Sequence, residues 1–143
     1  QKGVLSVEKK LFVETNNGTN CQIRPVTPEQ PLRIGDKVIV RLTIRTDREM
    51  NYVFLKDLRA GCFEPADQLS GPESRDGIWY YRSPKDVSEN FFIKRLPEGT
   101  FVLEYPVYVS RSGEYAGGIS TIQCMYAPEF VSHTAGESLR IMP

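Results

Sequence analysis

The chain has 143 residues, and its 18 Lys and Arg residues balance 18 Asp and Glu residues, so the formal net charge is zero. The hydrophobic fraction of 40% excludes an intrinsically disordered chain, and the lack of a basic surplus argues against a nucleic-acid-binding protein. Its apolar runs span only a few residues, far short of the ~18–20 that cross a bilayer, so we expect no direct membrane insertion.

The first predicted strand begins at Leu5. Apolar residues at Leu5, Val7, Leu11 and Val13 fall on one face, which is the period of a β-strand. Lys9 interrupts this face, so we expect a bulge or a strand break near Lys9.

Two longer segments alternate more regularly. In the first, every even position is apolar: Val38, Val40, Leu42 and Ile44. In the second, every odd position is apolar: Phe101, Leu103, Tyr105, Val107 and Val109. Both patterns predict strands with one buried face. Pro106 lies in the opposite register and cannot donate a ladder hydrogen bond, so we expect an edge strand or a bulge there.

Shorter strands are predicted in apolar segments bounded by turn residues: 21–25, 51–58, 77–82, 90–96, 118–126 and 138–142. Residues 61–76 form the longest irregular segment, and a single helical turn is expected near 83–88. Strands joined by short turns, about seven to nine in number, predict an all-β fold, an antiparallel β-sandwich. The length suits a single domain spanning residues 1–143.

Residues able to perform catalysis are few. His133 is the only histidine, and no nucleophile-elbow or protease-like pattern accompanies it. Cys21, Cys62 and Cys124 are too widely spaced for a short Cys-x-x-Cys metal site, and at most one disulfide can join two of them. By default, we expect three free, buried thiols. The sequence therefore predicts a protein that is not an enzyme and that uses no metal or cofactor.

The start of the chain suggests a larger parent protein. Gln1 is not an initiator Met, no signal peptide follows it, and strand-like sequence begins within a few residues. We therefore expect the chain to be a processed product or a piece excised from something longer. An excised domain need not contain a complete active site.

The segment from Met50 to Pro65 (MNYVFLKDLRAGCFEP) resembles a recurring block of bacterial alpha-2-macroglobulin-like proteins. Similar blocks follow in the expected order at residues 76–81, 90–92, 96–101, 113–115 and 122–130. Together the blocks extend over roughly residues 36–142, most of the chain, and they are similar to the C-terminal macroglobulin-like domain of the family, which follows the thioester domain. The resemblance implies an immunoglobulin-like or macroglobulin-like sandwich.

The family comprises very large bacterial proteins that trap proteases with a reactive thioester after a bait region is cut. The resemblance implies a periplasmic location or a membrane anchor at the cell surface. It also implies two kinds of partner: neighbouring domains of the same parent chain and, through the parent, target proteases. The thioester signature Cys-x-Glu-Gln is absent here, since Cys21 is followed by Gln-Ile-Arg. Any covalent chemistry therefore belongs to another domain.

The resemblance assigns one interdomain role to this chain. In members with a thioester, the Met-Tyr of a Met-Tyr-x-Pro motif helps to cover the bond, and here these residues are Met125 and Tyr126. An aromatic ring and a flexible thioether make a tight apolar lid over a bond that water hydrolyses. We expect both residues on an exposed loop; the alternative is that they end a core strand.

Two other motifs have structural and functional interpretations. Residues 112–115 (Ser-Gly-Glu-Tyr) resemble the tyrosine corner of immunoglobulin-like sandwiches, in which the Tyr hydroxyl ties a strand to the preceding turn. A second motif is the aromatic run Trp79, Tyr80 and Tyr81. Either at least one of these residues lies in the core, which we expect for Trp79, or the three form an exposed aromatic platform. Such a platform would indicate a cell-surface adhesive or carbohydrate-binding module, the alternative to the macroglobulin hypothesis.

Overall fold

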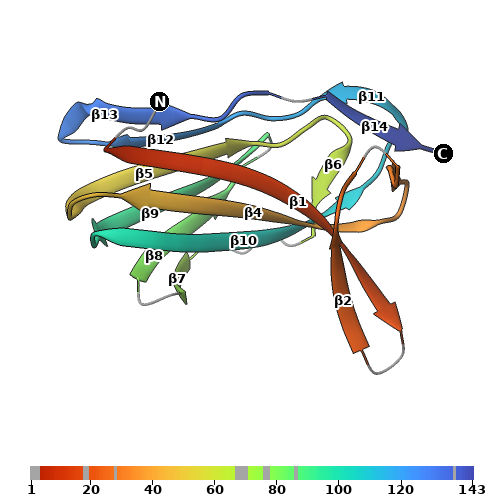
Figure 1. The fold of residues 1–143 in the computed structure, drawn as a ribbon, viewed down its shortest axis with the longest axis horizontal. Helices are drawn as coiled ribbons and strands as arrows, with labels where there is room; N and C mark the ends of the chain where they lie inside the picture. The colour runs from red at the N-terminus through yellow and green to blue at the C-terminus, as the bar shows by residue number, and fades with distance from the viewer. Residues whose placement is uncertain are drawn as a thin grey trace.

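The computed structural model describes residues 4–17, 20–27, 29–66, 71–75, 78–85, 87–136 and 138–143. Within these ranges the chain forms fourteen strands and no helix, and two large sheets confirm the predicted all-β sandwich (Figure 1). The described residues contain no helix long and apolar enough to cross a bilayer. The strand count exceeds the predicted seven to nine because five strands were not predicted. Four of them have only two to five residues, and the fifth, Ala127–His133, has few buried side chains.

The first sheet has five strands, in the order β2-β1-β4-β10-β6. Their bounds are Leu5–Asn17 for β1, Asn20–Pro25 for β2, Lys37–Thr46 for β4, Phe63–Pro65 for β6 and Gly99–Val109 for β10. All four pairings are antiparallel. The far end of the β1–β2 hairpin projects away from the two facing sheets (Figure 1).

The second sheet has six antiparallel strands, in the order β13-β12-β5-β9-β8-β7. Their bounds are Met50–Leu58 for β5, Gly71–Arg75 for β7, Ile78–Pro84 for β8, Ser88–Leu96 for β9, Ser120–Cys124 for β12 and Ala127–His133 for β13. A small third sheet joins β11 (Gly113–Ala116), β14 (Ser138–Met142) and β3 (Leu32–Arg33), with β14 and β3 parallel.

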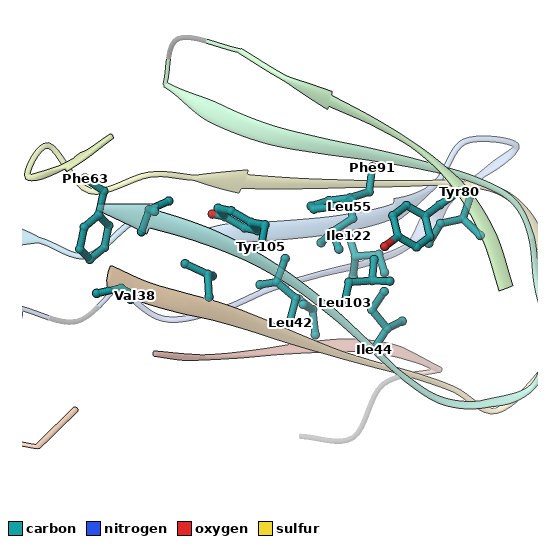
Figure 2. Packing of buried hydrophobic residues seen from close by; sticks show 14 of the residues in the cluster. Val38, Leu42, Ile44, Leu55, Phe63, Tyr80, Phe91, Leu103, Tyr105 and Ile122 are labelled. Carbon is teal, nitrogen blue, oxygen red and sulfur yellow. The ribbon is translucent and has the colours of Figure 1, made fainter. Parts of the chain in front are cut away.

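The core lies between the two large sheets, where side chains of β4 and β10 point toward those of β5, β9 and β12 (Figure 2). The predicted alternation sets this arrangement, since the even positions of β4 and the odd positions of β10 from 103 onward are buried. Tyr80, Phe91 and Tyr105 make a row of ring contacts across the core, with centroid distances of 5.7 and 6.1 Å. Burial of these apolar side chains is the main force that holds the sheets together.

The predicted bulge or break at Lys9 is wrong. β1 pairs with β4 in unbroken register over 10 residue pairs. Lys9 keeps its place on the inner face because its ammonium group lies 2.7 Å from the fully buried carboxylate of Asp57. The same ammonium donates to the carbonyl oxygens of Leu58 and Gly118, each at 3.2 Å. A cation on the apolar face therefore neutralises a buried anion.

Asp57 is the centre of a buried polar cluster. The Ser120 hydroxyl donates to its carboxylate at 2.7 Å, and the Tyr105 hydroxyl donates to the other oxygen. Burial raises the pKa of Tyr105 well above its usual value and the neighbouring Asp57 raises it further, so this hydroxyl remains a donor. Glu89, opposite Asp57 on β9, accepts from Arg82 at 2.8 Å. The cluster thus links strands of both large sheets.

Two predictions for the connecting segments are wrong. The expected helical turn near 83–88 is absent from the described residues, because β8 runs to Pro84 and the Lys85 amide donates to the Ser88 carbonyl at 2.7 Å to close a hairpin. Segment 61–76 is not irregular throughout, since it contains β6 and β7; residues 67–70 and 76 lie outside the described ranges. In both places a neighbouring strand supplies hydrogen bonds that outweigh weak local preferences.

The prediction of an edge strand or a bulge at Pro106 is wrong, because β10 lies between β4 and β6 and carries no bulge there. β10 pairs with β4 in unbroken register past Pro106. The Pro106 carbonyl accepts from the Ala66 amide at 3.3 Å, on the side of β10 opposite β4. The Pro106 nitrogen, which has no hydrogen to donate, therefore faces the side of β10 that only the three-residue β6 covers.

The predicted tyrosine corner is confirmed. The Tyr115 hydroxyl donates to the Ser112 carbonyl at 3.0 Å. Gly113 between them has a φ of 125°, a conformation that favours glycine. The Tyr115 ring packs against Gly61, where a Cβ would lie 3.4 Å from the ring. Tyr115 therefore fixes the chain locally.

Candidate functional site

Met125 and Tyr126 form the two-residue connection between β12 and β13. Cys124 pairs with Ala127 across this turn, so the two residues between them lie at the tip of a hairpin. Met125 is 52% exposed and Tyr126 is 78% exposed. Both side chains therefore lie outside the core, and the alternative in which they end a core strand does not hold.

Tyr52 of β5 supports this turn from the neighbouring strand. The Met125 amide donates to the Tyr52 carbonyl at 2.8 Å, which extends the β5–β12 pairing by one residue. The Tyr52 and Tyr126 rings make an edge-to-face contact with centroids 4.9 Å apart and planes at 70°. This is a favoured geometry for aromatic pairs. Tyr52 thus contacts the backbone of the turn at Met125 and the side chain of Tyr126.

The three aromatic residues of β8 point to alternate faces of the second sheet. Tyr80 is 5% exposed and packs against Phe91 in the core, whereas Trp79 is 70% exposed and Tyr81 is also exposed. The expectation that Trp79 is a core residue is therefore wrong, and Tyr80 cannot belong to an exposed platform. Tyr80 and Arg82 lie two residues apart on β8, so both face the core, where Arg82 pairs with the buried carboxylate of Glu89.

These exposed residues line one groove on the outer face of the second sheet. The groove has a volume of about 490 Å³, and its walls are formed chiefly by Tyr52, Trp79, Tyr81, Phe92, Met125 and Tyr126. We call it the aromatic groove. Among the described residues that line it, Lys94 alone is charged. The groove therefore suits an apolar partner, and Met125 and Tyr126 lie on the same surface as Trp79 and Tyr81.

Two groove residues, Tyr52 and Phe92, were not predicted as site residues. Alternation along each strand accounts for their positions. Val53 and Leu55 of β5 face the core, so Tyr52, whose φ is positive, faces outward. On β9, Phe91 faces the core, so its neighbour Phe92 faces outward. Alternation within each strand could have indicated these faces. The proximity of β5, β8 and the β12–β13 turn depends on the strand order, which local sequence does not encode.

Groups that could perform chemistry are not gathered in the groove. His133 lies exposed at the end of β13, and its ring has no hydrogen-bond or ion-pair partner among the described residues. Within the same ranges, no three His, Cys, Asp or Glu side chains cluster so as to hold a metal ion. The arrangement in the groove offers apolar contact area and aromatic rings.

The described cysteines are free and buried, as predicted. Cys62 and Cys124 form no disulfide, and burial raises the pKa of the Cys62 thiol. The Cys124 thiol lies 3.5 Å from the Asn51 carbonyl oxygen, next to the residue that supports the turn. The Cys21 side chain lies outside the described part of the structure. Both described thiols therefore act as small apolar core groups.

Comparison with known proteins identifies a matching family model and solved structures with a similar fold. A family model for the bacterial alpha-2-macroglobulin MG10 domain matches residues 5–129. The crystal structure of Salmonella alpha-2-macroglobulin reacted with methylamine is 22% identical with a TM-score of 0.75, over 100% of this chain and 9% of that chain. The crystal structure of native Escherichia coli alpha-2-macroglobulin from domain MG7 to the C-terminus is 16% identical with a TM-score of 0.73. The match covers 100% of this chain and 24% of that chain.

One curated protein is similar in sequence. Circularly permutated Ras protein 2 of Dictyostelium discoideum is 27% identical over 109 residues, which make up 76% of this chain and 3% of that protein. The chain thus spans between 3% and 24% of the length of these relatives.

Proposed function

The chain belongs to the bacterial alpha-2-macroglobulin family and matches its MG10 domain, and we propose that it is a non-catalytic packing domain of a much larger protease-trapping protein. Residues 1–143 would form a single macroglobulin-like domain of that parent. The aromatic groove carries this proposal, because it gathers six large apolar side chains on one outer sheet face. Contiguous exposed apolar patches of this kind mark interaction surfaces.

The groove would be covered by a neighbouring domain of the parent chain. Trp79 and Tyr126 are the most exposed of its aromatic side chains, and covering them removes apolar area from water. Aromatic residues and methionine are also the types enriched at the centres of protein interfaces. Target proteases would meet this domain only through the parent.

At the turn end of the groove, Met125 and Tyr126 would help to shield a thioester on the neighbouring domain. An acyl thioester survives in water only when water and amines are kept from its carbonyl carbon. The exposed turn carries both a ring and a thioether, and the Tyr52 ring contacts the Tyr126 ring edge-to-face. These groups could close over the bond without offering a base or a nucleophile.

Amine reactivity of the full-length parent tests the shielding role. Methylamine cleaves a thioester, so a Tyr126→Ala variant should incorporate methylamine about tenfold faster than the wild type, equivalent to about 1.4 kcal/mol of lost protection. Tyr108→Ala is the matched control, because Tyr108 is an exposed tyrosine on β10 of the first sheet. Equal rates for Tyr126→Ala and the wild type would contradict shielding, and a parent that incorporates no amine would leave only the packing role.

The proposed location follows from the family. We propose that the parent is extracytoplasmic, in the periplasm or held at the bacterial cell surface by a membrane anchor. Cell fractionation with an antibody against the domain checks this, and recovery of the parent in the cytosolic fraction would contradict it.

Exposure of Trp79 also favours a second candidate, a cell-surface adhesive or carbohydrate-binding module. Trp79 and Tyr81 could stack against sugar rings, with Tyr80 excluded by burial. Sugar recognition needs several polar partners as well, and among the described lining residues the groove supplies few beyond Lys94 and the tyrosine hydroxyls. Glycan-array binding that is lost in Trp79→Ala and kept in Tyr108→Ala would favour this candidate.

A further inference from the structure

Tyr52 has an unusual backbone conformation. Its φ is 61°, and it is the one residue other than glycine with a positive φ in the part of the chain that the structure describes. In this region Cβ crowds the backbone, so a bulky side chain is rare there and the conformation is strained. Surrounding contacts must hold Tyr52 in place, and strained residues of this kind concentrate at functional sites.

Two contacts of Tyr52 reach the Met125–Tyr126 turn. The carbonyl of Tyr52 accepts from the Met125 amide at 2.8 Å, and its ring meets the Tyr126 ring edge-to-face at 4.9 Å. One residue earlier, the Asn51 carbonyl lies 3.5 Å from the Cys124 thiol. The left-handed kink interrupts the alternation of β5 and lets Tyr52 contact both parts of the turn.

We propose that Tyr52 is a positioning residue that sets the orientation of Tyr126 toward the neighbouring domain. This inference rests on the proposed shielding function and adds a residue to it. Tyr126 is 78% exposed, so little else in the described structure restricts its ring, and the edge-to-face contact selects one orientation. Without the Tyr52 ring, the Tyr126 side chain samples other rotamers and covers the thioester for a smaller fraction of the time.

Two substitutions separate the ring of Tyr52 from its backbone conformation. Tyr52→Gly removes the ring and adopts a φ of 61° without strain, so we expect the fold and the Met125 hydrogen bond to be kept. Tyr52→Phe keeps the ring and removes only the hydroxyl. Tyr52→Asn is a second variant without the aromatic ring, because asparagine also tolerates left-handed backbone. Phe54→Ala is the matched control, since Phe54 lies on the same strand and stacks on Phe92 instead of Tyr126.

Methylamine incorporation is measured in the full-length parent, together with the urea midpoint of each variant. Tyr52→Gly and Tyr52→Asn should react about three- to tenfold faster than the wild type, the range expected for loss of one aromatic pair. Tyr52→Phe and Phe54→Ala should react at the wild-type rate. Equal urea midpoints for Tyr52→Gly and Tyr52→Phe, with different amine rates, indicate positioning and not a general loss of stability.

Tyr126→Ala, measured alongside, separates the two hypotheses. If Tyr126→Ala reacts faster and both Tyr52→Gly and Tyr52→Asn react like the wild type, the positioning role is wrong and shielding stands. Rapid reaction of Tyr52→Phe would also overturn the proposal, because that variant retains the ring contact. If Tyr126→Ala itself has no effect, shielding and positioning fall together.

Discussion

Lys9 occupies a position that alternation along β1 assigns to an apolar residue, and Asp57 explains the exception. The two groups come from facing sheets and lie 2.7 Å apart, with the carboxylate fully buried. Ser120 and Tyr105 supply further donors to the same carboxylate. A buried ion pair is weak evidence for stability, but removing one partner leaves an uncompensated charge in the core.

Replacing Lys9 with Met should therefore destabilise the domain strongly. Lys9→Met keeps the apolar stem and leaves Asp57 without its cation, so we expect a loss of about 3 kcal/mol in the free energy of unfolding. Urea denaturation of the 143-residue chain at pH 7 measures this loss. Lys10→Met is the matched control, because Lys10 is exposed on the other face of the same strand. A Lys9→Met midpoint equal to that of Lys10→Met would show that the pair contributes little.

At the residue scale, prediction from sequence succeeded where a local motif fixes the geometry. The Tyr115 corner needs only a turn and a hydroxyl within four residues, and the structure contains it. Trp79 was misplaced because either of two adjacent aromatic residues in a strand can face the core. Tyr80 takes that place through its contact with Phe91, a long-range partner that local sequence does not reveal.

At the element scale, the close approach of β12 to β5 depends on Gly118. An ideal Cβ at Gly118 would lie 1.6 Å from the Leu58 carbonyl oxygen, so the backbones touch where the segment enters β12. The Leu58 amide donates to the Ile119 carbonyl at 3.1 Å beside this contact. Any side chain at Gly118 must push the two backbones apart and weaken the pairing that leads to the Met125–Tyr126 turn.

Gly118→Ala should accordingly cost at least about 2 kcal/mol of stability, because backbone cannot yield as a side chain does. Gly136→Ala is the matched control: its Cβ would lie 3.5 Å from the nearest atom, an ordinary contact, and we expect a change within about 0.5 kcal/mol. Thermal unfolding of both variants, followed by circular dichroism, tests the difference. A Gly118→Ala midpoint no lower than that of Gly136→Ala would contradict it.

The long strands could be predicted from sequence and the short ones could not. β4 and β10 carry unbroken alternation, which places one face in the core, and the structure confirms both. β3, β6 and β11 have two to four residues, too few for a period to emerge, and each is defined by a distant partner strand. β13 has no fully buried side chain, whereas β12 buries every second one. A strand without a buried face need not alternate in sequence, so β13 was not predicted.

At the scale of the whole molecule, the strand order creates the candidate site. Tyr52, Trp79 and Tyr126 are far apart in sequence, and the order β12-β5-β9-β8 brings them to one outer face. The sequence could place Met125 and Tyr126 on a turn and could suggest an aromatic platform. It could not show that the two lie on the same groove, because that requires knowing which strands are neighbours.

We expect a neighbouring domain of the parent to cover the aromatic groove. Hydroxyl-radical footprinting tests it directly by comparing side-chain oxidation in the 143-residue chain and in the full-length parent. Trp79 is 70% exposed in the chain alone, and Tyr105, at 1%, provides a buried reference in both samples. We predict that Trp79 and Tyr126 are oxidised readily in the isolated chain and are protected nearly to the level of Tyr105 in the parent. Equal oxidation of Trp79 and Tyr126 in the two samples would show that no neighbouring domain covers the groove.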